Sequence, residues 1–341
     1  MSLYLSRRAV VMGAAAIGAC VSSAQARFEK PTAMQALLDY LQSQKTTGFL
    51  VVQDRKILIE RNWPAPADDT PFKAFAYETT ADGALLEDVA SQQKSFVSML
   101  VSVAIDKGLI DVSKPVCTYL GAGWSRAGAG QESQIRVVDV LTMSSGLKTD
   151  FTVDAPPGTT FLYNTPVYAV TKRIVAAAAK RPLEAVTRDW LTAPAGMSET
   201  SWRKRPASLG DVGNPTGLVT SPRDAAKFGQ IVLDGGKAAD GTRIVSEAQL
   251  NAMFVRSPVN PAYGRLWWLN GGTYAIRPPA MRVEGPLIPA APTDLVAALG
   301  ALDRKLYIAP AKKQIVVRMG AAAPDKDFDQ QLWLRLSAVL A

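Results

Sequence analysis

The chain has 341 residues, of which 48% are hydrophobic and 20% charged, a composition typical of a globular protein. A chain of this length can form a sizeable core without disulfides or metals. It contains no histidine, which excludes every Ser-His-Asp and Cys-His mechanism and every histidine metal site, so any hydrolytic chemistry needs another base. The formal net charge of +8 is mild for this length and does not by itself indicate nucleic-acid binding.

Residues 1–26 predict an export signal. Arg7 and Arg8 precede an apolar, alanine-rich run of about a dozen residues, and Ala24-Gln25-Ala26 then supplies an A-x-A cleavage site. The arginine pair favours the twin-arginine route. A competing interpretation treats Ile17–Cys20 as a lipobox, which would leave a lipoprotein that contacts the membrane through Cys20. We favour cleavage after Ala26, and either alternative predicts a periplasmic or secreted protein.

The mature chain is expected to begin with a helix and a hairpin. Apolar residues at 34, 37, 38 and 41 have the i, i+3, i+4, i+7 spacing of an amphipathic helix. Two β-prone runs follow at 48–53 and 57–63, and the polar residues between them predict a hairpin. The segment 91–109 is apolar on most sides and closes with Lys107-Gly108, which predicts a buried helix.

The middle of the chain is divided by Gly and Pro into short helical patterns. They span 137–143, 167–180, 183–191, 223–233 (with Ser221 as its expected N-cap) and 247–254. The densest positive run, Arg203–Arg205, is interpreted as a solvated loop in preference to a carboxylate-binding patch. Strand signals resume at 265–269, 295–299, 306–309 and 314–319, and apolar residues at 328, 332, 336 and 340 predict a last helix.

This order of elements predicts an α/β (α+β) fold. An antiparallel sheet is assembled from both ends of the chain and flanked by the N- and C-terminal helices, with a mainly helical region inserted. The expected domains are a signal peptide at 1–26, a sheet domain of 27–110 plus 256–341, and a helical domain at 111–255.

A candidate nucleophile stands at the start of the buried helix, in Ser91-Gln92-Gln93-Lys94. A spacing of three places both side chains on one helix face, with Cβ atoms roughly 5 to 6 Å apart. The helix N-terminus favours negative charge developing on Ser91, and the amine of Lys94 is within reach of its proton. This chemistry requires the pKa of Lys94 to fall well below about 10.4. Taken alone, the pattern is more often an N-cap serine beside a solvated lysine.

Further blocks of sequence change that interpretation. They are DVASQQKSF (88–96), DKGLIDVSKPV (106–116), VDVLTMSSGL (138–147), PG (157–158) leading to YNT (163–165), SPRDAAKFGQIVLDG (221–235) and YGRLWWLN (263–270). Over roughly residues 46–340 the chain closely resembles the serine β-lactamase and penicillin-binding-protein superfamily. It looks most similar to the esterase and amidase branch, related to class C β-lactamases, family VIII esterases and nylon-oligomer hydrolases.

The resemblance implies three catalytic residues: Ser91 as the nucleophile, Lys94 as its activator, and Tyr163 as a partner in proton transfer. Tyr163 departs from the family's Y-x-N pattern, because the asparagine comes one place early, at Asn164, and Thr165 holds the third position. We therefore assign no catalytic role to Asn164. A phenol or phenolate at position 163 beside Lys94 could relay a proton to a leaving group.

The third family motif, K-T-G or H-x-G on a strand lining the site, is altered. No lysine or histidine precedes Gly300. Gly300 is expected to keep the site open for close backbone approach. Gly300, Ala301 and Leu302 form the expected substrate and oxyanion region, in which a backbone N–H of this strand pairs with that of Ser91. The departure weakens the case for β-lactam and D-Ala-D-Ala recognition more than the case for hydrolysis.

The sequence leaves alternative roles for four further residues. Arg304 or Lys305 is a candidate for the positive charge that the altered motif lacks, and each is equally plausible as an outward-facing strand residue. Strand alternation at Trp267 and Trp268 predicts one side chain inward and one outward. One of them could line an acyl pocket, although core packing is the favoured role.

Residues and resemblance together predict an exported serine hydrolase that cleaves an ester or amide bond of a small-molecule or peptide substrate through an acyl-enzyme on Ser91. No metal, organic cofactor or nucleic-acid partner is implied. Two alternatives stay open. One is a D,D-peptidase or β-lactamase acting on peptidoglycan or β-lactams, and the other is a non-catalytic penicillin-binding-like envelope protein that captures an acyl ligand.

Overall fold

The computed structural model describes residues 32–210, 213–278 and 280–340. The predicted export segment 1–26, including Cys20, lies outside the described residues. Among the helices of these three ranges, none has the length and apolar character needed to cross a membrane.

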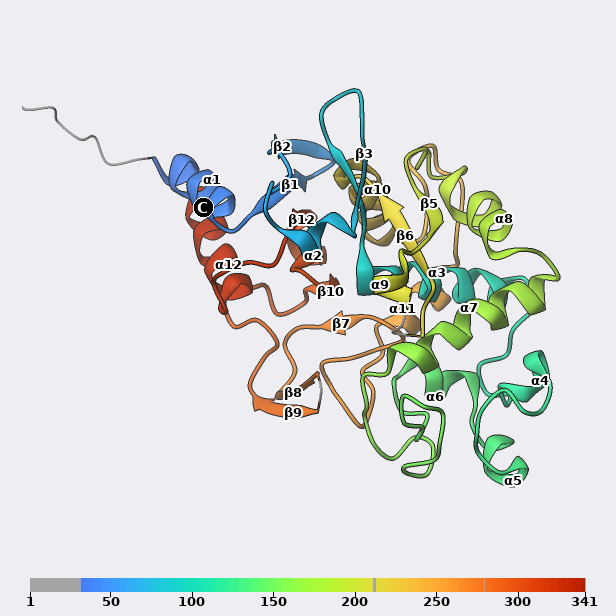
Figure 1. Ribbon diagram of the computed structural model, residues 1–341. Helices are drawn as coiled ribbons and strands as arrows, with labels where there is room; N and C mark the ends of the chain where they lie inside the picture. The colour runs from blue at the N-terminus through green and yellow to red at the C-terminus, as the bar shows by residue number, and fades with distance from the viewer. Residues whose placement is uncertain (1–31, 211–212, 279, 341) are drawn as a thin grey trace, which may run out of the picture.

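Both ends of the chain build one six-stranded antiparallel sheet with the order β2-β1-β12-β11-β10-β7 (Figure 1). Its strands are β1 (Thr46–Gln53), β2 (Lys56–Asn62), β7 (Trp268–Leu269), β10 (Val296–Gly300), β11 (Arg304–Ala309) and β12 (Gln314–Gly320). Strands β1, β11 and β12 are buried along nearly their whole length. Each contains a short apolar run, at 49–52, 306–309 and 315–317, which is why they could be predicted.

Helices cover both faces of this sheet. The first and last helices, α1 (Ala33–Ser43) and α12 (Phe328–Val339), lie side by side on one face (Figure 1), where the rings of Tyr307 and Trp333 are 5.6 Å apart. Helix α10 (Pro222–Leu233) packs on the other face, close enough that a Cβ added at Gly229 would lie 3.3 Å from Leu306. Leu306 and Tyr307 are adjacent in β11 and face opposite helices, as strand alternation requires. The predicted fold class is confirmed.

The segment between the two halves of the sheet holds the helices from α2 to α11 (light blue to orange in Figure 1). Its longest helices are α3 (Gln93–Asp106) and α7 (Thr165–Ala179), which pack against each other. The shorter ones are α2 (Thr70–Lys73), α4 (Cys117–Leu120), α5 (Ala129–Glu132), α6 (Val137–Leu141), α8 (Leu183–Thr187), α9 (Ala207–Gly210) and α11 (Glu247–Met253). As predicted, α3 is a buried helix, and Ser221 caps α10 by accepting from the N–H of Asp224 at 3.2 Å.

Two further strand pairings were not predicted. A four-stranded sheet has the order β3-β4-β6-β5, formed by β3 (Ala76–Thr79), β4 (Leu85–Asp88), β5 (Ser201–Lys204) and β6 (Thr216–Thr220). A separate hairpin pairs β8 (Tyr274–Arg277) with β9 (Met281–Glu284). Strands of four or five residues are too short for alternation to stand out against the surrounding turns.

Two sequence-based predictions are wrong in this part of the chain. Arg203 belongs to β5 and Arg205 is only 8% exposed, so 203–205 is not a solvated loop. The predicted strand at 265–269 shrinks to β7, because Leu266 has a φ of 61°, which interrupts extended backbone. Trp267 and Trp268 are consequently both buried instead of alternating.

Candidate active site

Ser91 lies at a sharp junction between strand β4 and helix α3. A short 3₁₀ turn, Ala90–Gln92, links the two elements. Ala90 has a φ of 50°, which a residue with a Cβ adopts only when its surroundings impose it. Its N–H donates to the carboxylate of Asp88 at 2.8 Å, and this bond holds the turn. The half-buried Ser91 side chain borders a cavity of about 200 Å³.

Lys94 lies one helical turn beyond Ser91, on the same face, as its spacing predicted. Its Nζ is 2.8 Å from Ser91 Oγ and 3.3 Å from Thr165 Oγ1. The same Nζ lies 4.7 Å from the ring centres of both Tyr163 and Tyr168. The side chain is therefore fixed between two aromatic rings with its amine against the serine hydroxyl.

The environment of Lys94 favours the uncharged amine. Burial lowers its pKa well below 10.5, and the positive charges of Arg205 and Lys172 lower it further. Among the described residues no carboxylate forms an ion pair with it. A neutral amine 2.8 Å from a hydroxyl oxygen can accept the hydroxyl proton, so Lys94 has the form that a general base requires.

Tyr163 is held beside this pair by an aromatic cluster. Its ring stacks on Trp268 at 5.7 Å and meets Tyr263 edge-on at 6.2 Å. Burial raises the pKa of Tyr163 to about 12, with the nearby hydroxyl of Ser91 acting in the opposite direction. At neutral pH the side chain is a phenol, which can donate a proton but is not a base.

Trp267 and Trp268 have separate roles. The ring of Trp267 packs in the core, 5.8 Å from Phe228 and 5.4 Å from Phe254. Trp268 instead stacks against the ring of Tyr163. Neither tryptophan is among the residues that line the cavity at Ser91.

Asn164 and Thr165, the two residues after Tyr163, have different roles. Asn164 Oδ1 accepts from the N–H of Val167 at 3.1 Å and caps α7, while its Nδ2 donates to Leu147 O at 2.9 Å. The oxygen and the nitrogen of the Asn164 amide are therefore both hydrogen-bonded to backbone groups and not to Lys94. Thr165 contacts Lys94 in its place, consistent with the decision to give Asn164 no catalytic role.

Two of the three residues predicted for the substrate and oxyanion region, Gly300 and Ala301, lie close to the Ser91 turn. A Cβ added at Gly300 would lie 2.3 Å from Val89 O, so only glycine allows this close approach. Ala301 lines the cavity together with Ser91. Leu302 does not: it has a φ of 58° and its carbonyl accepts from Arg318 Nη1 at 2.8 Å, which fixes the far side of the turn.

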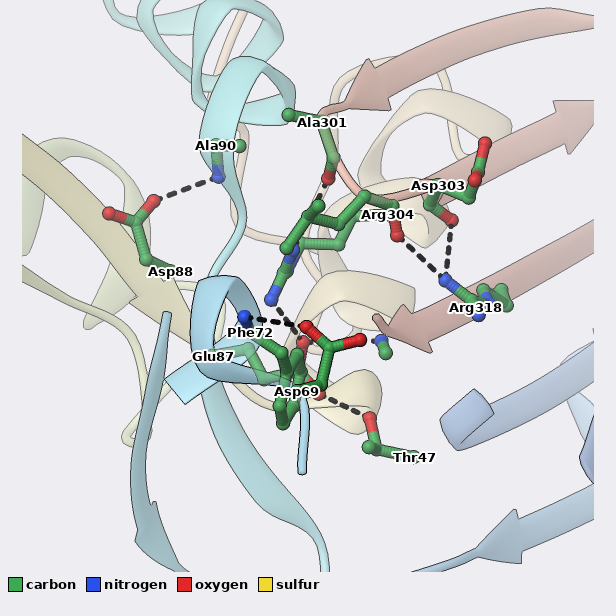
Figure 2. A network of polar contacts seen from close by, with 12 residues as sticks. Thr47, Asp69, Phe72, Glu87, Asp88, Ala90, Ala301, Asp303, Arg304 and Arg318 are labelled. Atoms are coloured by element: carbon green, nitrogen blue, oxygen red, sulfur yellow. Dashed lines mark hydrogen bonds and ion pairs between the residues drawn. The ribbon is translucent and has the colours of Figure 1, made fainter. Parts of the chain in front are cut away.

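Neither Arg304 nor Lys305 supplies positive charge to the cavity, and neither faces outward. Figure 2 shows Arg304 turned inward to Glu87, where the two groups form an ion pair at 2.8 Å with both side chains fully buried. Arg304 Nη1 also donates to Ala301 O at 3.2 Å. Lys305 pairs with Asp329 at 2.9 Å on α12. Both cations are therefore paired with carboxylates outside the cavity.

The cation in the cavity wall is Arg205, which the sequence analysis placed in a solvated loop in preference to a carboxylate-binding patch. Arg205 forms a doubly bonded ion pair with Asp88, at 2.7 and 2.9 Å, and its Nη1 donates to Asn214 O at 3.1 Å. The remaining lining residues are Phe75, Ala90, Gln93, Thr165, Leu209 and Asn214. Within the described part of the chain, no three His, Cys, Asp or Glu side chains gather as a metal site would require.

Replacing Gly300 with alanine is expected to lower the free energy of unfolding by about 1–3 kcal/mol, because the new Cβ meets the backbone carbonyl of Val89. Urea titration measures this loss. Gly130→Ala is the control: Gly130 lies in the short helix α5, is exposed, and has nothing within 4 Å of its added Cβ, so stability should stay the same or rise by up to about 1 kcal/mol. Equal stability of the two variants would contradict the close approach of β10 to the serine turn.

Known proteins resemble this chain in sequence and in fold. The family model described as Beta-lactamase matches residues 35–331. Penicillin-binding protein 4 of Amycolatopsis lactamdurans is 25% identical over 209 residues, covering 48% of this chain and 55% of that protein. The chain thus spans about half the length of this curated relative.

Solved structures show the same fold at low identity. A proposed 6-aminohexanoate-dimer hydrolase from Bacillus anthracis has a TM-score of 0.68 and 18% identity, covering 89% of this chain and 82% of that one. A class C β-lactamase from Rhodobacter sphaeroides has a TM-score of 0.62 and 13% identity, covering 91% and 99%.

Proposed function

Because the chain belongs to the beta-lactamase family, a family of hydrolases, we propose that it is a serine hydrolase that cleaves an ester or amide bond through an acyl-enzyme on Ser91. The observation that carries the proposal is the 2.8 Å contact between Ser91 Oγ and an amine whose pKa is lowered by burial. The cavity beside this contact gives a carbonyl group a place to bind.

In the first step Ser91 Oγ attacks the carbonyl carbon and its proton passes to Lys94 Nζ. A bond forms between Oγ and carbon, and the carbonyl oxygen becomes an oxyanion. The backbone N–H groups of Ser91 and Ala301 are the proposed donors to that oxygen, since both residues border the cavity. Hydrogen bonds aimed at the developing charge lower the barrier without later reorganisation.

In the second step the tetrahedral intermediate collapses and the leaving group departs. Tyr163 donates its proton to the leaving oxygen or nitrogen, and Lys94 returns the proton taken from Ser91 to the phenolic oxygen. The raised pKa of Tyr163 keeps it protonated for this role. Water then attacks the acyl-enzyme by the reverse proton route, which frees the acid and restores the Ser91 hydroxyl.

Intact-mass spectrometry after exposure to a fluorophosphonate tests the nucleophile. Ser91 Oγ should displace fluoride and leave one phosphonyl adduct, which Ser91→Ala should not form. Ser133→Ala is the matched control, because this exposed serine at the C-cap of α5 donates its hydroxyl to Gly130 O, and its loss should leave the adduct in place. A folded wild-type protein that forms no adduct would refute the proposal and favour the non-catalytic alternative.

Benzylpenicillin, added in the same mass assay, separates esterase or amidase activity from the D,D-peptidase and β-lactamase alternative. We expect turnover of a short 4-nitrophenyl ester but no persistent penicilloyl adduct, because Arg304 and Lys305 pair with buried or partly buried carboxylates outside the cavity. A stable penicilloyl adduct on Ser91 would instead support penicillin-binding activity.

We also propose that the enzyme acts after export. The support is the sequence of residues 1–26, with its arginine pair, apolar run and A-x-A site. The intact mass of protein purified from the periplasm of an expressing bacterium should correspond to a chain beginning at Arg27. A diacylated N-terminus at Cys20 would identify the lipoprotein alternative.

A further inference from the structure

Asn214 carries a polar group that the proposed mechanism does not use. The residue precedes β6, is 1% exposed, and borders the cavity at Ser91. Its Oδ1 accepts a hydrogen bond from Lys172 Nζ at 2.6 Å. Its Nδ2 has no hydrogen-bond partner among the described residues. A buried amide that leaves a donor unpaired costs free energy, so a vacant donor beside a reactive serine calls for a functional explanation.

Lys172 fixes the direction of this amide. Its Nζ lies on α7 and bonds to Asn214 Oδ1, to Thr216 O at 2.8 Å and to Thr216 Oγ1 at 3.2 Å. When protonated, Lys172 has three N–H donors and no acceptor, so it bonds to the amide oxygen and not to the amide nitrogen. Lys172 and Thr216 line a second cavity of about 350 Å³, and Asn214 borders both cavities. Because Oδ1 is bonded to Lys172, we infer that Nδ2 is directed toward the cavity at Ser91.

One of the two basic groups near this donor lacks an anionic partner. Arg205 stands next to Asn214 and is neutralised by Asp88, whereas Lys172 has no ion-pair partner in the described part of the chain. Burial, reinforced by Arg205, lowers the pKa of Lys172 to about 7, which reflects this missing anion. A bound carboxylate would supply that anion and raise the pKa of Lys172, which favours the ammonium form that orients the amide.

The acyl part of the substrate is the part that reaches this wall. Tyr163, which protonates the leaving group in the proposed mechanism, is not among the residues that line the cavity, whereas Ser91, Thr165 and Asn214 are. The leaving group therefore departs on the Tyr163 side and the acyl chain occupies the cavity.

We propose that Asn214 Nδ2, held by Lys172 and flanked by Arg205, binds a carboxylate at the far end of the substrate's acyl chain. The inference rests on the proposed function, because it assigns the acyl group that Ser91 receives. In this subsite Asn214 is a binding residue and Lys172 is a positioning residue that acts through the orientation of the amide.

Two esters of equal acyl length test the subsite: the mono-4-nitrophenyl ester of adipate, with a terminal carboxylate, and 4-nitrophenyl hexanoate, with a terminal methyl. The measured quantity is the ratio of their kcat/KM values at pH 7, which should exceed one for the wild type. Asn214→Leu should lower the ratio about tenfold or more, the effect of one hydrogen bond to a charged group. Lys172→Met should lower it less, since the freed amide can still rotate into place.

Asn214→Asp is a second variant, which tests the subsite if Asn214→Leu fails to fold. An aspartate keeps an acceptor for Lys172 but replaces the donor with a negative charge, so the ratio should fall at least as far as in the leucine variant. Asn251→Leu, at an exposed position on α11, should leave the ratio unchanged. An unchanged ratio in both Asn214 variants, with Ser91 still labelled by the fluorophosphonate, would overturn the inference and leave the proposed function intact.

Binding without turnover tests the inference independently of hydrolysis. The Ser91→Ala variant binds both esters without attacking them, so the ratio of their Kd values can be measured by titration. The adipate ester should bind at least about tenfold more tightly than the hexanoate ester, and Asn214→Leu should abolish that preference. Equal Kd values in the Ser91→Ala background would refute the subsite even if the proposed hydrolysis also failed.

Discussion

Replacing Lys94 with methionine is expected to lower kcat for a short 4-nitrophenyl ester by about a thousandfold, the usual contribution of a general base. The chain has no histidine that could substitute for the lost amine. Methionine matches the length of the lysine stem and packs between the rings of Tyr163 and Tyr168. Because the substitution also removes a buried amine, the free energy of unfolding should stay the same or rise. Steady-state kinetics and urea titration measure the two quantities.

Two controls make this result specific to proton transfer. Lys94→Arg retains a cation of similar length but cannot deprotonate, so it should be as inactive as Lys94→Met. Lys114→Met removes an exposed lysine and should leave kcat within a factor of about two. If Lys94→Met is folded and retains near wild-type turnover, the proposed proton route is wrong.

The lowered pKa of Lys94 also fixes the sign of the pH dependence. The amine is neutral above its pKa and protonated below it, so kcat/KM should fall as the pH decreases through that pKa. The fluorophosphonate labelling rate of Ser91 should fall over the same range, because both reactions need the same base. A labelling rate that is independent of pH would contradict a neutral Lys94 as the base.

The sequence was sufficient to predict the centre of the candidate site because that part is local. Ser91 and Lys94 are three residues apart in one helical turn, and helix geometry alone brings them together. Tyr163 lies 72 positions away from Ser91, so its placement came from the resemblance and not from the spacing. The sheet strands at the C-terminal end were predictable from the short apolar runs at 306–309 and 315–317, where both faces of the sheet are buried.

The rest of the site depends on long-range partners that local patterns do not encode. Glu87 and Asp88 are adjacent in β4 and both are fully buried, yet Glu87 pairs with Arg304 and Asp88 with Arg205. The burial of a charged residue is decided by the presence of a partner, and here the partners come from different sheets: Arg304 from β11 and Arg205 from the residue after β5. For this reason Arg205 looked like part of a solvated loop, and Arg304 looked like a candidate for the site.

The Glu87–Arg304 pair leads to the largest expected change in stability. Glu87 receives hydrogen bonds from Thr47 Oγ1 and from the N–H of Gly320, and its ion pair with Arg304 joins β4 to β11 (Figure 2). Glu87→Gln keeps the shape of the side chain but leaves the Arg304 guanidinium buried without a counter-charge. The free energy of unfolding should fall by about 3–5 kcal/mol, measured by urea titration.

The double variant Glu87→Gln/Arg304→Met separates stability from the position of the oxyanion turn. Removing both charges should recover at least about 2 kcal/mol of the loss, because no buried charge is then unpaired. Arg304 also donates to Ala301 O, so the double variant loses a bond that fixes the proposed oxyanion donor next to Ser91. We therefore expect kcat/KM to stay about tenfold or more below wild type even where stability returns. A stable double variant with wild-type kcat/KM would show that Arg304 contributes to folding alone.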